Sequence, residues 1–231
     1  VFALVSIGGT AFGAAQIVIG EINPRTGALA VQGTAIHQGI LLAVEEANRR
    51  GGVSGRAITL LSRDDEGKPE RAIAAAEELA SRHRAAALIG GYVDSLVGPI
   101  GLVAERSRIP YLATASLDER LTLKGNRYFF RVSSLASYVR SMTGVVLEVF
   151  RPGNVAILHS STPGATQLAR RQKEILEKAG IQVSVFEQFS PGLSDFTPLL
   201  ARIRDRGAEV LISDTFFADH LLLVRQMAQT K

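Results

Sequence analysis

The chain has 231 residues, of which 46% are hydrophobic and 21% charged, a composition that fits a folded protein and excludes a wholly disordered one. It contains no cysteine, which excludes disulfide bonds, thiolate metal sites and a cysteine nucleophile. The net charge of +4 is spread over scattered basic residues and only 6% of residues are aromatic, so we expect solvated helix faces and no nucleic-acid partner.

The first 16 residues, VFALVSIGGTAFGAAQ, form an apolar run that ends in small residues. This pattern is typical of the hydrophobic region and cleavage zone of a secretory signal peptide, with Gly13 and Ala15 in the small positions before the cut. We therefore expect residues 1–16 to be a signal-peptide remnant and Gln16 to lie near the mature N-terminus. An ordinary buried strand or helix is the alternative.

Strands and helices alternate from residue 17 onward. The helix expected at residues 33–48 carries one apolar stripe and stops at a double glycine, which accepts the left-handed conformation of a helix end. Pro69 fits the first turn of another helix, where its missing N–H costs nothing. The first half is predicted to contain strands 17–22, 57–62, 86–90, 109–113 and 128–132 and helices 33–48, 69–80 and 95–107.

The same alternation starts again after residue 132. Strands and helices at this spacing form parallel sheets through right-handed crossovers. We therefore predict an α/β fold of two lobes, with parallel sheets flanked by helices, in which the first lobe spans residues 17–133 and the second residues 134–231. The second half is predicted to contain helices 135–150, 165–179, 196–206 and 218–228 and strands 155–159, 182–187 and 210–213.

The loops that follow the strands are the expected ligand site, because open parallel sheets bind ligands beyond the carboxyl ends of their strands. These loops are rich in hydroxyl residues and contain neither a GxSxG or P-loop motif nor a dinucleotide-binding GxGxxG. Hydroxyl and backbone N–H groups suit a small carboxylate, and Asp94 would suit an ammonium group. Any single serine or threonine there can equally be a helix N-cap. The loops are residues 23–33, 90–99, 114–121, 160–167 and 214–219.

Residues 47–80, ANRRGGVSGRAITLLSRDDEGKPERAIAAAEELA, resemble a segment of the leucine/isoleucine/valine-binding protein family. These are type I periplasmic binding proteins that serve ABC importers. LIGGYVDSLVGPI, RIPYLATAS, YFFRVSS, NVAILHS and SDFTPLLARIRDRGAEVLI follow in the family's order, so the resemblance covers the chain from about residue 17 to residue 231. It implies a Venus-flytrap, in which two α/β lobes close on an amino acid or similar small ligand.

In the first lobe, the resemblance implies that the loop after the third strand holds the ligand carboxylate, at Asp94 or Ser95. An aspartate would repel a carboxylate, so either Ser95 takes this role or the ligand differs in type or orientation. After the fourth strand, a hydroxyl pair maps to Thr114 and Ser116 if one residue is inserted, and otherwise to Ala115 and Leu117. From the first loop, Gln32 corresponds to a side chain that packs on the ligand.

The second lobe departs further from the family pattern. A family tyrosine corresponds to about Gly164, and an aromatic residue maps to Phe216 or Phe217. The acidic ammonium ligand of the family would fall beyond Lys231, and a cysteine pair found in some members is replaced by Gly67 and Val93. These departures put branched-chain specificity in doubt.

The resemblance also implies a location and partners. We expect a periplasmic protein secreted through a signal peptide, which binds a small amino-acid-like ligand and docks on an ABC permease in the inner membrane. We expect no metal or other cofactor, since the four histidines lie far apart, and a monomer when the protein is complete. Family architecture has further crossovers in both lobes, so the second lobe is expected to be incomplete.

Two other functions remain open from the sequence. A ligand-sensing receptor or regulator domain of the same fold would bind an amide or an amino acid without serving transport. An enzyme on an α/β sheet would need a catalytic group, and we find none in the loops.

Overall fold

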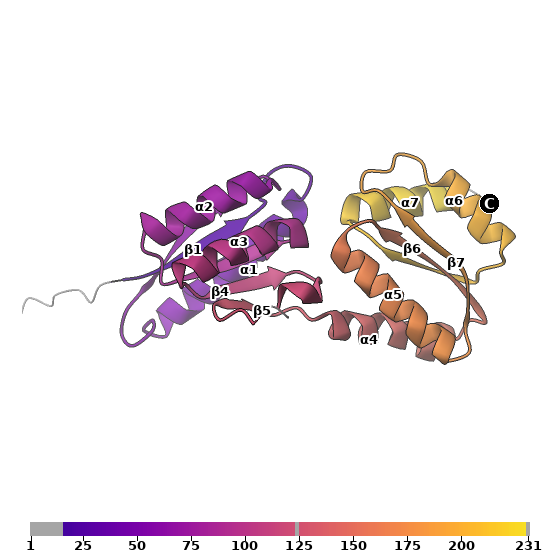
Figure 1. Ribbon diagram of the computed structural model, residues 1–231, viewed down its shortest axis with the longest axis horizontal. Coiled ribbons are helices and arrows are strands. Elements are labelled where there is room, and N and C mark those ends of the chain that lie inside the picture. Colours follow the sequence, from indigo (N-terminus) through magenta and orange to yellow (C-terminus); the bar gives the residue numbers. More distant parts are fainter. Residues whose placement is uncertain (1–15, 123–124, 230–231) are drawn as a thin grey trace, which may run out of the picture.

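The strands of this protein form two separate parallel sheets in a computed structural model that describes residues 16–122 and 125–229 (Figure 1). The first sheet has the order β2-β1-β3-β4-β5, and the second has the order β7-β6-β8. The predicted α/β class and two-lobed architecture are confirmed. The strands are β1 Ile17–Asn23, β2 Ile58–Asp64, β3 Ala87–Tyr92, β4 Tyr111–Ala115, β5 Phe129–Arg131, β6 Asn154–Ser160, β7 Gln182–Phe189 and β8 Val210–Asp214.

The helices lie close to where their apolar stripes predicted them, with two differences, of which the first is a short 3-10 helix, η1, within the loop expected at residues 114–121. The single helix expected at residues 135–150 changes pitch after Val145 and continues as a π-turn, in which Arg151 N–H donates to the carbonyl of Val146 over 2.8 Å. The helical elements are α1 Ala30–Arg49, α2 Pro69–Ser81, α3 Asp94–Ser107, η1 Glu119–Leu121, α4 Leu135–Val145, η2 Val146–Phe150, α5 Pro163–Lys178, α6 Thr197–Asp205 and α7 Phe217–Gln229.

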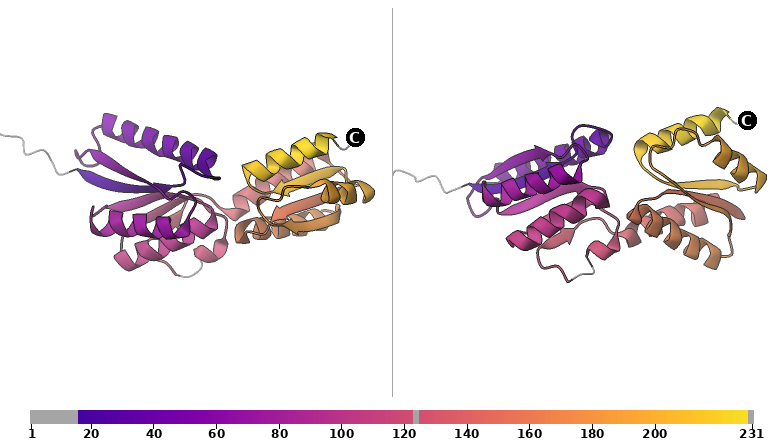
Figure 2. Two further views of the ribbon diagram at one scale, coloured as in Figure 1. Left: turned by 90° about the horizontal axis from the view of Figure 1, so that it is seen from above. Right: turned by 45° about the horizontal axis from the view of Figure 1, so that its top comes forward.

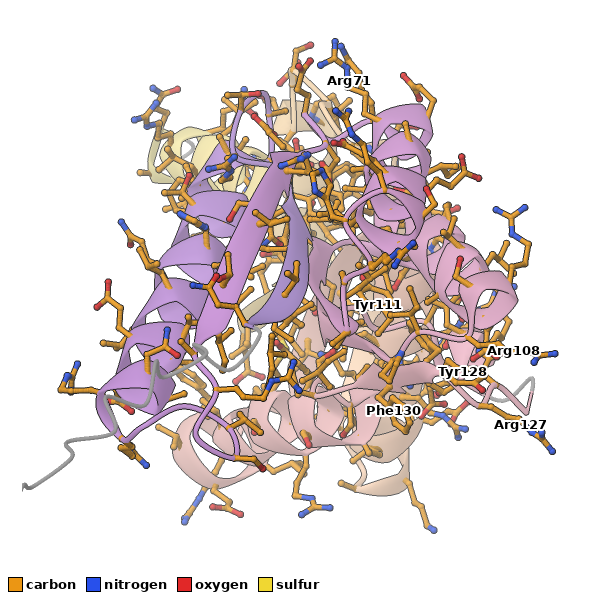
Figure 3. The ribbon with its side chains drawn as sticks, turned by 90° about the vertical axis from the view of Figure 1, so that its left-hand side faces the viewer. Arg71, Arg108, Tyr111, Arg127, Tyr128 and Phe130 are labelled. Carbon is orange, nitrogen blue, oxygen red and sulfur yellow. The ribbon has the colours of Figure 1, made fainter. Side chains whose placement is uncertain are left out.

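The first lobe is a sheet with helices on both faces, α1 on one side and α2 and α3 on the other (Figure 2). Its core joins the apolar sides of α2 and α3 to the sheet, and Leu79, Leu88 and Ile100 are fully buried there. Tyr111 is buried among them and donates a hydrogen bond to the carbonyl of Gly90 at 3.0 Å (Figure 3). This bond gives the only polar atom of the ring a partner and fixes the end of β3.

The second lobe is built around β6, whose residues are buried on both faces. Ala156 and Leu158 point into the core beneath α6 and α7, whereas Val155 and Ile157 point into the core beneath α5. This alternation follows from the two-residue period of a strand. A strand buried on both sides reads in the sequence as a continuous apolar run, as NVAILHS does.

The two lobes lie side by side and contact each other where α4 and α5 meet the loop after β4 (Figures 1 and 2). Ser134 caps α4 by accepting a hydrogen bond from Ser137 N–H at 3.1 Å. Leu135, Val139 and Leu168 form a small buried cluster that Leu117 of the first lobe joins. The lobe boundary between residues 133 and 134 stays a prediction, and residues 1–15 of the expected signal remnant lie outside the described residues.

The strand order places the ligand site. Both sheets begin with the order second–first–third, so the chain leaves neighbouring strands toward opposite faces at β1/β3 and at β6/β8. The loops diverge at such a switch point and leave a crevice at the carboxyl ends of the strands.

Within residues 16–122 and 125–229, no helix is long and apolar enough to cross a membrane. The same part of the chain has no group of three or more histidine, aspartate and glutamate residues that could hold a metal ion.

Two glycines of α1 give a matched test of this packing. A Cβ atom on Gly33 would lie 2.0 Å from the carbonyl oxygen of Pro24, whereas one on Gly39 would have no heavy atom within 4 Å. Alanine stabilises a helix by up to about 1 kcal/mol over glycine. We expect Gly39→Ala to raise the free energy of unfolding by up to that amount and Gly33→Ala to lower it by roughly 1–3 kcal/mol, measured by urea denaturation. Equal stabilisation by both would contradict the close approach of α1 to Pro24.

Candidate functional site

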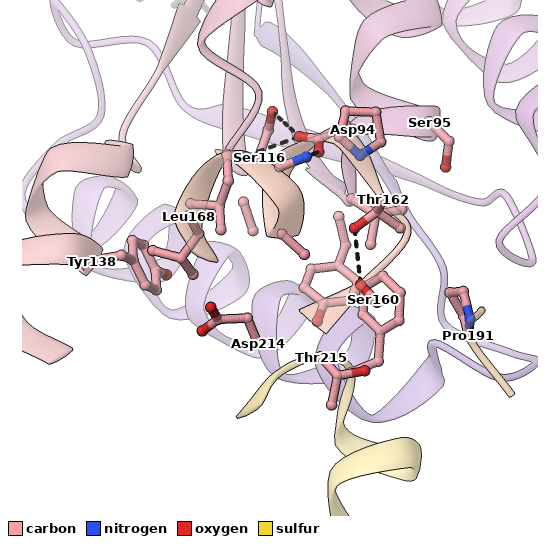
Figure 4. Close-up of a pocket in the computed structure, with 18 of the residues that line it drawn as sticks. Asp94, Ser95, Ser116, Tyr138, Ser160, Thr162, Leu168, Pro191, Asp214 and Thr215 are labelled. Carbon is pink, nitrogen blue, oxygen red and sulfur yellow. Dashed lines mark hydrogen bonds between the residues drawn. The ribbon is translucent and has the colours of Figure 1, made fainter. Parts of the chain in front are cut away.

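A cavity of about 550 Å³ lies between the lobes, at the carboxyl ends of both sheets (Figure 4). Its volume is within the range of small-molecule sites. Its walls come chiefly from the loops after β3, β4, β6 and β8, which are four of the loops that the sequence indicated. Both lobes therefore contribute walls to one cavity.

Most of the residues predicted to bind a ligand do line this cavity. Ser95 is exposed at the start of α3, Ser116 is buried in the loop after β4, and Phe216 lies just after β8. Whether these residues bind a ligand stays a prediction. The predicted residues that line the cavity are Asp94, Ser95, Ala115, Ser116, Gly164 and Phe216, together with Leu117, which the alignment without an inserted residue gave.

Gln32 and Thr114 are two predicted site residues that are not among the cavity-lining residues. Gln32 lies in the first turn of α1, and Leu29, just before that helix, lines the cavity instead. Thr114 was expected in a loop, but β4 continues to Ala115, and the Thr114 hydroxyl donates to the carbonyl of Gly91 at 2.8 Å. Thr114 therefore supports the loop after β3 from a position inside the sheet.

The carboxylate of Asp94 holds the most hydrogen bonds in the site. Its Oδ1 accepts from the Ser116 hydroxyl at 2.8 Å, from Leu117 N–H at 2.9 Å and from Asp118 N–H at 3.0 Å. Its Oδ2 accepts from Gly164 N–H of the second lobe at 2.9 Å. Hydrogen bonds to a charged group contribute roughly 1.5–3 kcal/mol each, so this carboxylate fastens the loop after β4 to the start of α5.

The loop after β3 has the backbone needed to aim Asp94 at these donors. Gly90 and Gly91 have φ values of +115° and +88°, where a Cβ atom would meet the carbonyl of Ile22 or the hydroxyl of Tyr111. Val93 adopts φ 66° and ψ 149°, a strained conformation for a β-branched residue that costs roughly 1–3 kcal/mol. The next residue, Asp94, begins α3, where the helix dipole favours a negative charge.

Gly164 allows the second lobe to approach this carboxylate. A Cβ atom at this position would lie 2.5 Å from Asp94 Oδ2 and 2.8 Å from Leu117 Cβ. Gln167, one turn further along α5, donates to Asp118 Oδ1 at 2.7 Å and accepts from Glu119 N–H at 3.1 Å. The lobes are thus joined by hydrogen bonds from two successive positions on one helix face.

Asp214, at the end of β8, is the second carboxylate in the cavity wall. It is 5% exposed, and its Oδ1 accepts one hydrogen bond, from the Gln172 amide at 3.3 Å. Its Oδ2 has no partner among the described residues. Burial raises the pKa of Asp214 to about 7, and the hydrogen bond from Gln172 offsets a small part of that rise.

The remaining walls are largely apolar. Tyr92 and Phe216, from different lobes, stack edge to face with their ring centroids 6.4 Å apart. Burial, and secondarily Tyr138, raise the pKa of the Tyr92 hydroxyl, so this group stays protonated near neutral pH. Tyr138 and Met142, four residues apart on α4, complete the wall with Leu168 of α5.

Sequence reasoning missed Asp214, Tyr138, Met142 and Leu168 as cavity residues. Asp214 lies in a loop that the sequence singled out, and its place directly after a buried strand was the signal that could have found it. Tyr138 and Met142 carried no such signal, because an apolar stripe on a helix reads as core.

The arrangement suits binding. A few fixed polar groups set against apolar walls orient a small molecule and exclude water around it. The hydroxyl of Ser160, fully buried and 3.1 Å from that of Thr162, adds a further polar group from the second lobe.

Comparisons with known proteins agree with this geometry. A sequence profile of the periplasmic binding protein family matches residues 16–231. An amino acid binding protein of Pseudomonas aeruginosa is 30% identical over 93% of this chain and 58% of its own length. Leu/Ile/Val-binding protein homolog 2 of Brucella abortus is 30% identical over 98% of the chain and 60% of its own length. The chain therefore spans about three fifths of these relatives.

A solved structure shows the same fold. The branched-chain amino acid transporter substrate binding protein LivJ of Streptococcus pneumoniae, in complex with isoleucine, superposes with a TM-score of 0.84 at 21% identity. The superposition covers 93% of this chain and 61% of that one.

The raised pKa of Asp214 predicts a pH-dependent stability. Because an aspartate in an unfolded chain titrates near 3.9, the folded protein alone keeps this proton between about pH 4 and pH 7. The stabilisation is full below pH 4 and is lost as the pH rises to about 7, by an amount on the order of 4 kcal/mol. Asp214→Asn should remove this loss, so that the variant gains stability over the unmodified protein between pH 4 and pH 8 in urea denaturation. Asp205→Asn, at an exposed carboxylate of α6, is the control, and equal pH profiles for all three proteins would contradict the burial of Asp214.

Proposed function

The chain belongs to the periplasmic binding protein family, and on that premise we propose that it is the solute-binding component of an ABC importer. The observation that carries this proposal is the cavity of about 550 Å³ whose walls come from both lobes. A solute held there would contact both lobes at once and would favour the arrangement in which they lie together.

We further propose that the solute belongs to the branched-chain or related amino acids. The names of the two relatives, an amino acid binding protein and a Leu/Ile/Val-binding protein homolog, support this class. The apolar side of the cavity, formed by Tyr138, Met142 and Leu168, suits an aliphatic or aromatic side chain. Asp94, Ser95, Ala115, Ser116, Gly164 and Phe216 are the proposed contacts among the residues singled out in the sequence.

The proposed mechanism involves no chemical step. Solute binding stabilises the closed arrangement of the lobes, and this form docks on a membrane permease in the periplasm. Closure requires that the solute bind the closed state more tightly than the open one, since equal affinity for both would shift nothing. Hinge closure around a ligand is an established motion of two-lobed binding proteins.

A thermal-shift screen tests the solute class. A ligand at ~100 times its dissociation constant adds ~2.7 kcal/mol to the stability of the folded state, which raises Tm by several degrees for a protein of this size. We expect such a rise from at least one member of a panel containing leucine, isoleucine, valine and their amides. Benzoate and glucose serve as ligands of other classes, and a rise confined to them would contradict the amino-acid class.

Two adjacent phenylalanines test the site. Phe216 lines the cavity, whereas Phe217 is 54% exposed and is not among the lining residues. Removing a buried aromatic wall costs roughly 1.5–3 kcal/mol of apolar burial, so Phe216→Ala should weaken binding of the ligand found by the screen by about 10- to 100-fold in calorimetric titration. Phe217→Ala should leave the affinity within about twofold. The reverse pattern would place the solute elsewhere.

A further inference from the structure

The charged residues that line the cavity, within the part of the chain that the structure describes, are two carboxylates, Asp94 and Asp214. They differ in their hydrogen bonding. Asp94 accepts four hydrogen bonds from protein groups, whereas Asp214 accepts one long bond and has an oxygen without a partner. This contrast bears on which chemical groups a solute can present to each end of the cavity.

Asp94 occupies an anion site that the protein itself has built. The donors around it are one hydroxyl and three backbone N–H groups, including Gly164 N–H in the first turn of α5. Hydroxyl groups and the free N–H groups at a helix N-terminus are hydrogen-bond donors that suit a carboxylate. Here the carboxylate is supplied by a side chain of the same chain, so these donors are already used.

A free carboxylate on the solute would meet two obstacles at this end. It would have to compete with Asp94 for the N–H groups of Leu117, Asp118 and Gly164. It would also approach a like charge, and two like charges in contact repel each other most strongly where water is excluded. The loop after β4 therefore disfavours a solute carboxylate.

Asp214 presents the opposite situation. Its carboxylate lies in the cavity wall on the side where Tyr138 lies (Figure 4), and it is 95% buried, since 5% of its surface is exposed. A buried acceptor without a partner is destabilising, and more so when it is charged. A solute that donates a hydrogen bond or carries a positive charge would recover this cost, and the apolar walls around Asp214 would strengthen the contact.

We propose that this cavity selects a solute that presents an ammonium or other N–H donor group to Asp214 and has no free carboxylate, because Asp94 occupies the place of one. An amide or amine derivative of an amino acid has this chemistry. The inference rests on the proposed binding function and narrows its solute class. It also assigns Asp94 as the residue that excludes the carboxylate and Asp214 as a binding residue.

Leucine and leucinamide are the matched pair of probes, since they share a side chain and an ammonium group and differ in the carboxylate. In calorimetric titration of the unmodified protein, we expect leucinamide to bind at least tenfold more tightly than leucine. Tighter binding of leucine would overturn this inference and leave the proposed function standing. If neither probe binds, and the valine and isoleucine counterparts do not bind either, both the inference and the proposed solute class would be contradicted.

Variants at the two carboxylates assign their roles. Asp94→Ser opens the anion site and leaves a hydroxyl, so the preference for leucinamide should fall by at least tenfold through a gain in leucine affinity. Asp214→Asn should weaken the binding of leucinamide at least tenfold. Asp205→Asn, at an exposed carboxylate of α6 that does not line the cavity, is the control and should leave the ratio of the two affinities unchanged. An unchanged ratio in Asp94→Ser would overturn the role given to Asp94.

Acetate gives a readout that does not depend on the solute. In Asp94→Ala the donors are left without their carboxylate, so acetate at millimolar concentration should raise the Tm of this variant by several degrees relative to chloride at equal ionic strength. The unmodified protein should show no such difference. If acetate stabilises both proteins equally, the anion site is not filled by Asp94 and the inference is wrong. Should Asp94→Ala fail to fold, the comparison of leucine with leucinamide on the unmodified protein still tests whether the cavity disfavours a carboxylate.

Discussion

The carboxylate of Asp94 is the point on which the arrangement of the two lobes depends. Its two oxygens accept hydrogen bonds from the loop after β4 and from Gly164 in the first turn of α5, which is 70 residues from Asp94 in the sequence. The bonds are charge-assisted and partly shielded from water, so each is stronger than a bond between neutral groups. The strained backbone at Val93 and the absence of a side chain at Gly164 both serve this contact, because one aims the carboxylate and the other lets α5 reach it.

This contact joins the two lobes directly, through the Gly164 N–H that donates to Asp94 Oδ2 at 2.9 Å. A side chain takes the place that a small carboxylate would fill, and the cavity beside it remains roomy, at about 550 Å³. In the proposed function, the solute would have to supply further contacts in the cavity to favour closure, because this direct bond already joins the lobes without one. Asp214 and the ring pair of Tyr92 and Phe216 are the features that offer such contacts.

Asp94 and Asp214 also show how the surroundings of a carboxylate determine its hydrogen bonding. Asp94 stands at two helix N-termini among hydrogen-bond donors, an environment that suits a charged carboxylate. Asp214 stands at the end of a buried strand with one donor at 3.3 Å, and burial raises its pKa to about 7. The same residue type therefore acts as a structural anchor in one loop and as an under-satisfied acceptor in the other.

The sequence by itself determined the elements, their parallel pairing and the loops that carry the site. Apolar runs such as NVAILHS and the glycines and prolines between them set these features locally, and every expected strand is present. The sequence also pointed to Asp94 as an unusual residue, but it could not show that the N–H of Gly164, 70 residues away at the start of α5, donates a hydrogen bond to it. That contact, the unpartnered oxygen of Asp214 and the displacement of Thr114 from the cavity were decided by tertiary structure. The physical reason is that hydrogen-bond satisfaction and burial depend on which loops meet in space, whereas periodicity reports only on the segment that carries it.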